Sequence, residues 1–342
     1  MRWIVFRCLI LALIAAFLLP TVAYAAEPDA EPRATDVVIV GKAAFNNGCR
    51  VQGGSSWFAG QQFANITGRL GVLPEGGKRY AIVIGSNYTG SVAPGEQIPF
   101  VPPFQFELGY AEADAEAMAG LLEGMYGFDK VILLTGHGAS QRKILNSIER
   151  IGDLAKHGDE VVFFYSGHGA SYTDAHGGGK DGEDGCRGRG VTHEGIVTDE
   201  GNGKEVKFLW DYELASAFDE FRTNRIVFMF DGCLAGGMTE LAEQGRIVCM
   251  ATTKTGIAAE AGIITTPDGA VIEINHGLFT FFLLGALSGD VTVEEAFNFA
   301  SGSLLDMTAL IQGGIAYYYG PEIAAFWGTP TIVDLFSKDL LL

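Results

Sequence analysis

A histidine and a cysteine in this sequence each stand just beyond an apolar run with the composition of a buried strand. His168 follows the run Glu160–Tyr165, and Cys233 follows the run Asn224–Phe230. Runs of β-branched and aromatic residues bounded by glycine are typical of an α/β sheet, in which ligands bind beyond the carboxyl ends of the strands. If the two runs are neighbouring strands, a thiol and an imidazole share one crevice, as nucleophilic catalysis by cysteine requires.

The chemistry open to such a pair is the hydrolysis of an acyl bond. A free cysteine titrates at about 8.5, so an imidazole must accept the proton or stabilise the thiolate before the sulfur becomes a good nucleophile. We therefore assign His168 as the general base and Cys233 as the nucleophile. The backbone N–H groups of Gly169 and Cys233 are the candidate oxyanion hole.

The elements that must position this pair begin at residue 79, where buried runs and amphipathic stretches alternate. We expect strands at Arg79–Gly85, Lys130–Leu134, Glu160–Tyr165, Asn224–Phe230 and Arg246–Ala251, and a closing strand at Thr329–Phe336. We expect helices at Ala111–Tyr126, Ser140–Lys156, Asp211–Arg222, Leu234–Glu243, His276–Leu287 and Val293–Leu310. The alternation predicts an α/β fold with a mainly parallel sheet and helices on both faces.

The first 25 residues have the pattern of a secretory signal peptide. Arg2 and Arg7 flank the start of an apolar run to Leu19, and the small-residue sequence Ala-Tyr-Ala follows at 23–25. The run is shorter than the roughly 20 residues that span a bilayer, so we expect cleavage rather than a membrane anchor. The protein would then be exported, to a periplasm or to the extracellular space, with no membrane contact after the signal is removed.

The rest of the chain is acidic and rich in apolar residues. Removing Arg2 and Arg7 from the 23 basic residues leaves 21 against 41 acidic ones, a formal charge of −20. Such a surface repels nucleic acid and attracts basic peptides, although solubility outside the cell explains the same charge without a partner. The hydrophobic content of 48% is enough for a buried core from residue 79 onward, after a loop-rich extension or small subdomain at 26–78.

The remaining cysteines and histidines give weaker signals. Cys49 and Cys186 lie in glycine-rich loops and are the plausible disulfide pair of an exported protein, but the sequence does not establish the connectivity. His176, Cys186 and His193 could join His168 around zinc. Their spacing matches no compact zinc signature, so we do not expect zinc there.

Four blocks of the sequence together resemble the caspase-like cysteine peptidases, and most closely the metacaspases and their bacterial relatives. The blocks are Tyr-Ser-Gly-His-Gly at 165–169, Asp-Gly-Cys-Leu-Ala-Gly at 231–236, Tyr-Ala-Glu-Ala-Asp-Ala at 110–115 and His-Gly-Leu-Phe-Thr at 276–280. The resemblance covers about residues 79–287 and implies the same roles for His168 and Cys233. It also implies a caspase-like three-layer sandwich with a sheet of about six strands, divided into a large-subunit-like part at 79–245 and a small-subunit-like part at 246–342.

Charge and resemblance together predict the substrate. True caspases bind a substrate aspartate with arginines and have glutamine two residues before the nucleophile, whereas this chain has Asp231 there. Asp114 matches the metacaspase aspartate of the first helix. Two carboxylates at a buried pocket select a positive side chain, so we expect cleavage after arginine or lysine in a peptide or protein. Alternatively, Asp114 caps its helix and Asp231 orients the Cys233 loop.

The resemblance also implies calcium as an activator, although the chemistry itself requires no cofactor. Metacaspases bind calcium through carboxylates in the loop after the catalytic histidine and before the next helix. The corresponding residues here are Asp181 and Asp184 in the loop and Asp211 before the helix. A solvated acidic turn accounts for the loop equally well.

Two alternatives to an active caspase-like peptidase remain open. Gly232, Leu234 and Ala235 replace side chains that are commonly polar in the family, so the chain could be a weakly active or inactive caspase-like scaffold that binds peptides or partners. A clostripain- or legumain-like peptidase would share the chemistry but differ in pocket and topology.

Overall fold

The computed structural model describes residues 61–87, 108–174, 191–201, 207–265, 271–308, 312 and 327–342. Several predicted features lie outside the described residues, namely the signal peptide at 1–25, the Cys49–Cys186 pair, His176, Asp181 and Asp184. Within the described ranges, none of the helices has both the length and the apolar character needed to cross a membrane.

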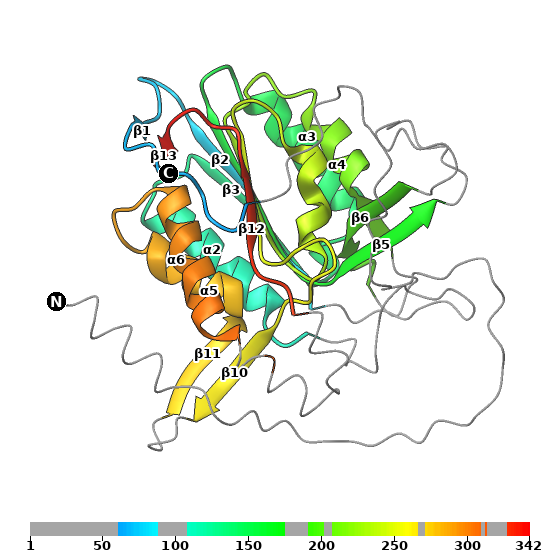
Figure 1. The fold of residues 1–342 in the computed structure, drawn as a ribbon. Helices are drawn as coiled ribbons and strands as arrows, with labels where there is room; N and C mark the ends of the chain where they lie inside the picture. The colour runs from blue at the N-terminus through cyan, green and yellow to red at the C-terminus, as the bar shows by residue number, and fades with distance from the viewer. Residues whose placement is uncertain are drawn as a thin grey trace, which may run out of the picture.

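A six-stranded sheet forms the centre of the described structure (Figure 1). Its strands lie in the order β12-β9-β8-β4-β2-β3, and all neighbouring pairs are parallel except β12 with β9. The strands are β2 (Arg79–Gly85), β3 (Lys130–Thr135), β4 (Glu160–Ser166), β8 (Ile226–Asp231), β9 (Arg246–Met250) and β12 (Thr331–Asp334). The predicted mainly parallel sheet is confirmed, and each strand ends within two residues of its expected limits.

Alternating side chains of the strands fill two separate cores, one on each face of the sheet. Val83 and Phe164 face one core, together with helices α2 (Ala111–Gly124), α5 (Leu278–Leu287) and α6 (Val293–Asp306). Ile82 and Phe163 face the other, with α3 (Gln141–Leu154) and α4 (Asp211–Phe218). Figure 1 shows α2, α5 and α6 on one side of the sheet and α3 and α4 on the other. Because both faces are buried, these strands are continuous apolar runs in the sequence.

Three smaller sheets were not predicted. They are the antiparallel sheet of β5 (Gly169–Asp174), β6 (Val191–Thr198) and β7 (Lys207–Trp210), the hairpin of β10 (Glu260–Thr265) and β11 (Val271–Gly277), and the parallel pair β1 (Leu70–Gly71) and β13 (Asp339–Leu340). Their strands are short or mix polar residues and glycine with apolar ones, so no apolar run marks them. Pairing with a neighbour, rather than local preference, fixes such strands.

Two predicted helices differ from the structure in type or at their first residue, and the helix expected at Asp211–Arg222 ends at Phe218. The α-helix expected at Leu234–Glu243 is instead a 3₁₀ helix, η2 (Ala235–Leu241); another short 3₁₀ turn, η1, covers Gly136–Gly138. Gly236 and Gly237 lie in η2 where a Cβ atom would overlap neighbouring groups, so close packing outweighs α-helix geometry there. His276 does not begin α5. It is part of β11, where it pairs with Ala261 of β10, and its side chain bonds a carboxylate of α2.

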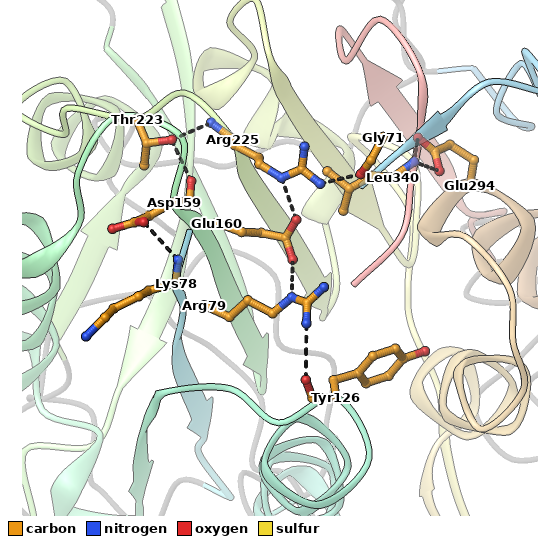
Figure 2. Close-up of polar contacts among 10 residues, drawn as sticks. All are labelled: Gly71, Lys78, Arg79, Tyr126, Asp159, Glu160, Thr223, Arg225, Glu294 and Leu340. Atoms are coloured by element: carbon orange, nitrogen blue, oxygen red, sulfur yellow. Dashed lines mark hydrogen bonds and ion pairs between the residues drawn. The ribbon is translucent and has the colours of Figure 1, made fainter. Parts of the chain in front are cut away.

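Glu160, at the amino end of β4, is fully buried between two guanidinium groups (Figure 2). Its carboxylate lies 2.6 Å from Nε of Arg225 and 3.4 Å from Nε of Arg79. Arg225 also donates to the carbonyl oxygen of Gly71 and stacks over the Phe336 ring, 5.0 Å from its centroid. A buried charge paired on both sides can remain in the core, so this cluster joins β2, β4 and β1 at the amino edge of the sheet.

The described N-terminal residues are fastened to the C-terminal segment. Gln61 forms two backbone hydrogen bonds with Ile332 of β12, of 2.8 and 2.7 Å. The Asp339 carboxylate accepts the N–H and hydroxyl of Thr67, at 2.7 and 2.8 Å, and the N–H of Gly68 at 2.6 Å. Residues 61–71, within the segment that the sequence assigns to the extension, therefore lie along the sheet edge and the chain end.

A buried carboxyl group in α6 makes stability depend on pH. Glu294 is fully buried and accepts the N–H of Leu340 (Figure 2), and burial raises the pKa of Glu294 to about 7 from its ordinary 4.5. An acid with a higher pKa in the folded state loses stabilising free energy as pH rises between these values. We expect Glu294→Gln to match the wild type at pH 4.5 and to be more stable by about 2 kcal/mol at pH 8.

Urea unfolding at the two pH values measures this difference. Exposed Glu149 on α3 is the matched control, whose change to Gln leaves the pH dependence unaltered. A Glu294→Gln variant whose stability follows the wild type at both pH values would contradict the assignment.

Candidate active site

His168 and Cys233 leave the central sheet from adjacent strands. β4 and β8 pair in parallel, and their last residues, Ser166 and Asp231, lie opposite each other. The N–H of Gly167 donates to the carbonyl oxygen of Asp231 at 3.1 Å, so the pairing continues past the end of β4. The segments that carry the predicted base and nucleophile therefore meet at the carboxyl edge of the sheet.

Glycines allow these two segments to touch through their backbones. A Cβ atom on Gly169 would overlap the carbonyl oxygen of Cys233, and one on Gly232 would lie 2.8 Å from the carbonyl oxygen of Gly167. The same position on Gly232 is 3.7 Å from the nitrogen of Gly169, the first predicted oxyanion donor. The backbone N–H group of Gly169, the first predicted oxyanion donor, thus lies next to the loop that carries Cys233.

The backbone of His168 is fixed by a buried tyrosine. The hydroxyl of Tyr165 lies 2.7 Å from the carbonyl oxygen of His168 and 2.9 Å from that of Val197, and the N–H of Val197 donates to His168 at 3.1 Å. Burial raises the pKa of Tyr165 far above its ordinary value, so the phenol stays neutral and remains a donor. His168 is therefore held between β4 and β6.

The Cys233 side chain is partly buried. Burial raises its pKa to about 11; the nearby charge of Asp231 adds to this rise, and N–H groups of Ala258 and of Cys233 itself oppose it by hydrogen bonding to the sulfur. The next residue, Leu234, has a φ of 62°, a left-handed conformation that is costly for a residue with a side chain. Because the pKa of the thiol is raised, the sulfur needs a proton acceptor to react at neutral pH. The left-handed turn at Leu234 places Cys233 just before η2.

The two predicted specificity carboxylates both lie against Gly277, on the side where a Cβ atom would project. Asp114, in the first turn of α2, accepts the Ser166 hydroxyl at 2.7 Å, the N–H of Gly277 at 3.1 Å and a bond with His276 Nδ1 at 2.7 Å. A Cβ atom on Gly277 would be 2.9 Å from Asp114 Oδ2 and closer still to Oδ2 of Asp231. The structure thus brings Asp114 and Asp231 together at a glycine.

This pair concentrates negative charge away from water. Burial, followed by the charge of Asp114, raises the pKa of Asp231 to about 7, and the N–H and hydroxyl of Thr280, at 2.9 and 2.6 Å, oppose the rise. Burial also raises the pKa of Asp114, against the bonds from His276 and Ser166. A cation between the two carboxylates would relieve their mutual repulsion.

Sequence reasoning missed a third carboxylate and a histidine at this cluster. Glu260, the first residue of β10, accepts the N–H groups of Gly109 at 2.7 Å and Tyr110 at 3.2 Å. Burial raises the pKa of Glu260, and its charge contributes to the rise at Asp231. The hairpin that carries both Glu260 and His276 has no apolar run, so the sequence offered no signal beyond the His-Gly-Leu-Phe-Thr block.

Only one of the three predicted calcium ligands, Asp211, is among the described residues. It begins α4 and lies with His193 and Glu240 in a group whose ligand atoms are within 4.8 Å of one another. Burial and the charge of Glu194 raise the pKa of Asp211 to about 7. Calcium prefers six to eight oxygen ligands, so an imidazole beside Asp211 fits it poorly. Calcium activation stays a prediction, because Asp181 and Asp184 are not described.

Comparison with known proteins identifies the family. A family model described as a caspase domain, of peptidase family C14, matches residues 78–305. The chain therefore belongs to the caspase-domain family of cysteine peptidases. No curated protein matches the sequence.

A solved structure offers a more distant comparison. The crystal structure of protein GSU0716 from Geobacter sulfurreducens is 18% identical, with 64% of this chain and 88% of that chain covered and a TM-score of 0.45. At this level the likeness carries no argument about function.

The contact between the two loops can be tested at Gly169. Alanine there would push against the Cys233 carbonyl, so we expect Gly169→Ala to lose about 1–3 kcal/mol of stability, as over-packed sites do. Gly120, exposed inside α2 with open space around it, is the matched control, and Gly120→Ala should gain about 0.5–1 kcal/mol. Denaturant unfolding measures both; a neutral Gly169→Ala would show that the loops do not touch.

Proposed function

We propose that this protein is a caspase-like cysteine endopeptidase that cleaves after arginine or lysine, with Cys233 as nucleophile and His168 as general base. The observation that carries the proposal is the backbone contact between the Gly167–Gly169 and Gly232–Cys233 segments at the carboxyl edge of a caspase-domain sheet. Ligands of such sheets bind at this edge.

The proposed reaction follows the general course of thiol peptidases. His168 removes the proton from the Cys233 thiol, whose raised pKa makes a base necessary, and the sulfur attacks the carbonyl carbon of the scissile bond. The N–H groups of Gly169 and Cys233 stabilise the oxyanion that forms. His168 then gives the proton to the leaving amine as the C–N bond breaks. Finally, water deprotonated by His168 hydrolyses the thioester and releases the acid.

Buried carboxylates support the proposed preference for a basic residue. Asp231 stands two residues before Cys233, and Asp114 and Glu260 lie close enough to raise its pKa. A guanidinium or ammonium group would neutralise this cluster, whereas a substrate aspartate would add a further negative charge. The same carboxylates also hold Gly277 and Thr280 in place, so they serve the fold as well as the pocket.

Peptide reporters with arginine, lysine or aspartate before the scissile bond test the proposal. We expect turnover of the basic reporters and none of the aspartate one. Cys233→Ala should lower kcat/KM by at least about 10³-fold, and His168→Ala by about 10²–10⁴-fold. Cys249→Ala is the matched control, because it removes the other described free thiol, inside β9, and should keep the activity.

Two outcomes would contradict the proposal in different ways. Preferential turnover of the aspartate reporter would overturn the basic specificity but leave the Cys-His chemistry in place. If no reporter is cleaved and a thiol-reactive arginine inhibitor does not label Cys233, a peptide-binding scaffold would be the better description.

We further propose that the protein is exported and loses residues 1–25. The support is the pairing of Arg2 and Arg7 with an apolar run and the Ala-Tyr-Ala sequence at 23–25. The intact mass of the protein from a secreting host should correspond to a chain that begins at Ala26. A mass that retains residues 1–25 in the membrane fraction would instead indicate an anchor.

A further inference from the structure

Three potential metal ligands converge outside the proposed catalytic pair. His193 of β6, Asp211 at the start of α4 and Glu240 of η2 each place one ligand atom within 4.8 Å of the others. His193 and Asp211 are 1% exposed, and Nδ1 of the histidine is 3.7 Å from Oδ1 of the aspartate. These residues are far apart in the sequence, and the fold gathers them.

The first two of these side chains are already oriented by their surroundings. The Asp211 carboxylate accepts the N–H of Tyr212 at 2.9 Å and the N–H of Glu194 at 3.2 Å. The ring of Tyr212 packs edge-on against the His193 ring, with centroids 5.0 Å apart. Contacts of this kind fix the direction of metal ligands in proteins and raise their affinity.

The surroundings favour a cation. Glu194 is 2% exposed and adds a further carboxylate; it packs against Gly237, where any Cβ atom would overlap it. Lys254 brings one positive charge, 3.5 Å from Glu194, from a side chain that is half exposed. Carboxylate oxygens and an imidazole nitrogen are ligands of divalent ions, and a positive charge placed between buried carboxylates stabilises them.

The type of ligand selects the ion. Zinc binds imidazole nitrogen and carboxylate oxygen at about 2.0–2.2 Å in tetrahedral sites, which spaces the ligand atoms by about 3.4 Å. The three atoms would each need to move inward by less than about 1 Å. Calcium, by contrast, takes oxygen ligands in larger number. We propose that His193, Asp211 and Glu240 form a binding site for a transition-metal ion of the zinc class, contrary to the expectation from sequence spacing.

The position of the proposed metal site in the fold indicates what a bound ion would do to the structure. β6 is paired with β5, which directly follows His168, and η2 begins two residues after Cys233. A bound ion would therefore tie together the segments behind the two proposed catalytic residues. None of the three ligands belongs to the proposed catalytic pair, so the role we assign to the ion is to hold these segments in place.

Metal binding can be measured without any peptidase activity. We would use the untagged mature chain with Cys233→Ala, so that the thiol cannot bind the metal, and titrate it with Zn²⁺, Co²⁺ and Ca²⁺. We expect one Zn²⁺ per chain, a rise in Tm, and the visible absorption of four-coordinate Co²⁺. Ca²⁺ should produce no comparable rise in Tm through these residues.

Variants identify the ligands. His193→Ala and Asp211→Asn should each weaken Zn²⁺ binding by at least about 100-fold. Glu240→Gln changes a partly exposed residue and keeps the side-chain shape, so it tests the site if the buried variants fail to fold. His137→Ala is the matched control, because His137 also lies beside an aspartate, Asp199 at 3.4 Å, but outside the cluster.

The results decide the proposal independently of the peptidase activity. Zn²⁺ affinity that is unchanged in Glu240→Gln and His193→Ala, or lost equally in His137→Ala, would overturn it. Binding of Ca²⁺ but not Zn²⁺, abolished by Asp211→Asn, would also overturn it and would support the calcium prediction instead. Cleavage of arginine reporters has no bearing on either result.

Discussion

The parallel pairing of β4 with β8 is the constraint on which the rest of the structure depends. Neighbouring strands lie about 4.8 Å apart, so whatever follows Ser166 and Asp231 must emerge side by side. Backbone contact at Gly169 then removes any room for a side chain between the two loops. The arrangement fixes the distance between the loops through hydrogen-bonded main chain, which is stiffer than contacts between side chains. Chemistry that depends on a thiol and an imidazole gains from that stiffness, because small displacements are costly in rate.

The two edges of the sheet provide buried acids with different partners. At the amino edge, Glu160 is matched by Arg79 and Arg225, as in a core that is built for stability. At the carboxyl edge, one histidine and a hydroxyl bond Asp114, and a hydroxyl and an N–H group bond Asp231. Burial raises the pKa values of both aspartates and of Glu160. Carboxylates that repel one another cost folding free energy, and such sites are commonly kept for binding or catalysis. The acids where the ligand is proposed to bind thus lack the arginine partners that Glu160 has at the opposite end.

The central strands could be predicted because burial on both faces makes them continuous apolar runs, and the positions of His168 and Cys233 followed from where those runs end. The hairpin β10–β11 could not be predicted in the same way. Glu260 and His276 reach the acidic cluster only through pairing between strands that mix polar and apolar residues, which local patterns do not reveal. Glu240 was missed because η2 is a 3₁₀ helix, shaped by close packing at Gly236 and Gly237 rather than by helix preference.

The bridge between Gln61 and Ile332 affects how this protein can associate with itself. β12 is one of the two outer strands of the sheet, and an outer strand offers a template on which a second chain can continue the hydrogen-bond ladder. Here the N–H and C=O of Ile332 that point outward are already used by Gln61, and Asp339 anchors the same segment a few residues later. A dimer whose sheet continued through β12 would first have to displace this segment. Residues 61–71 therefore protect the β12 edge against pairing with a second chain.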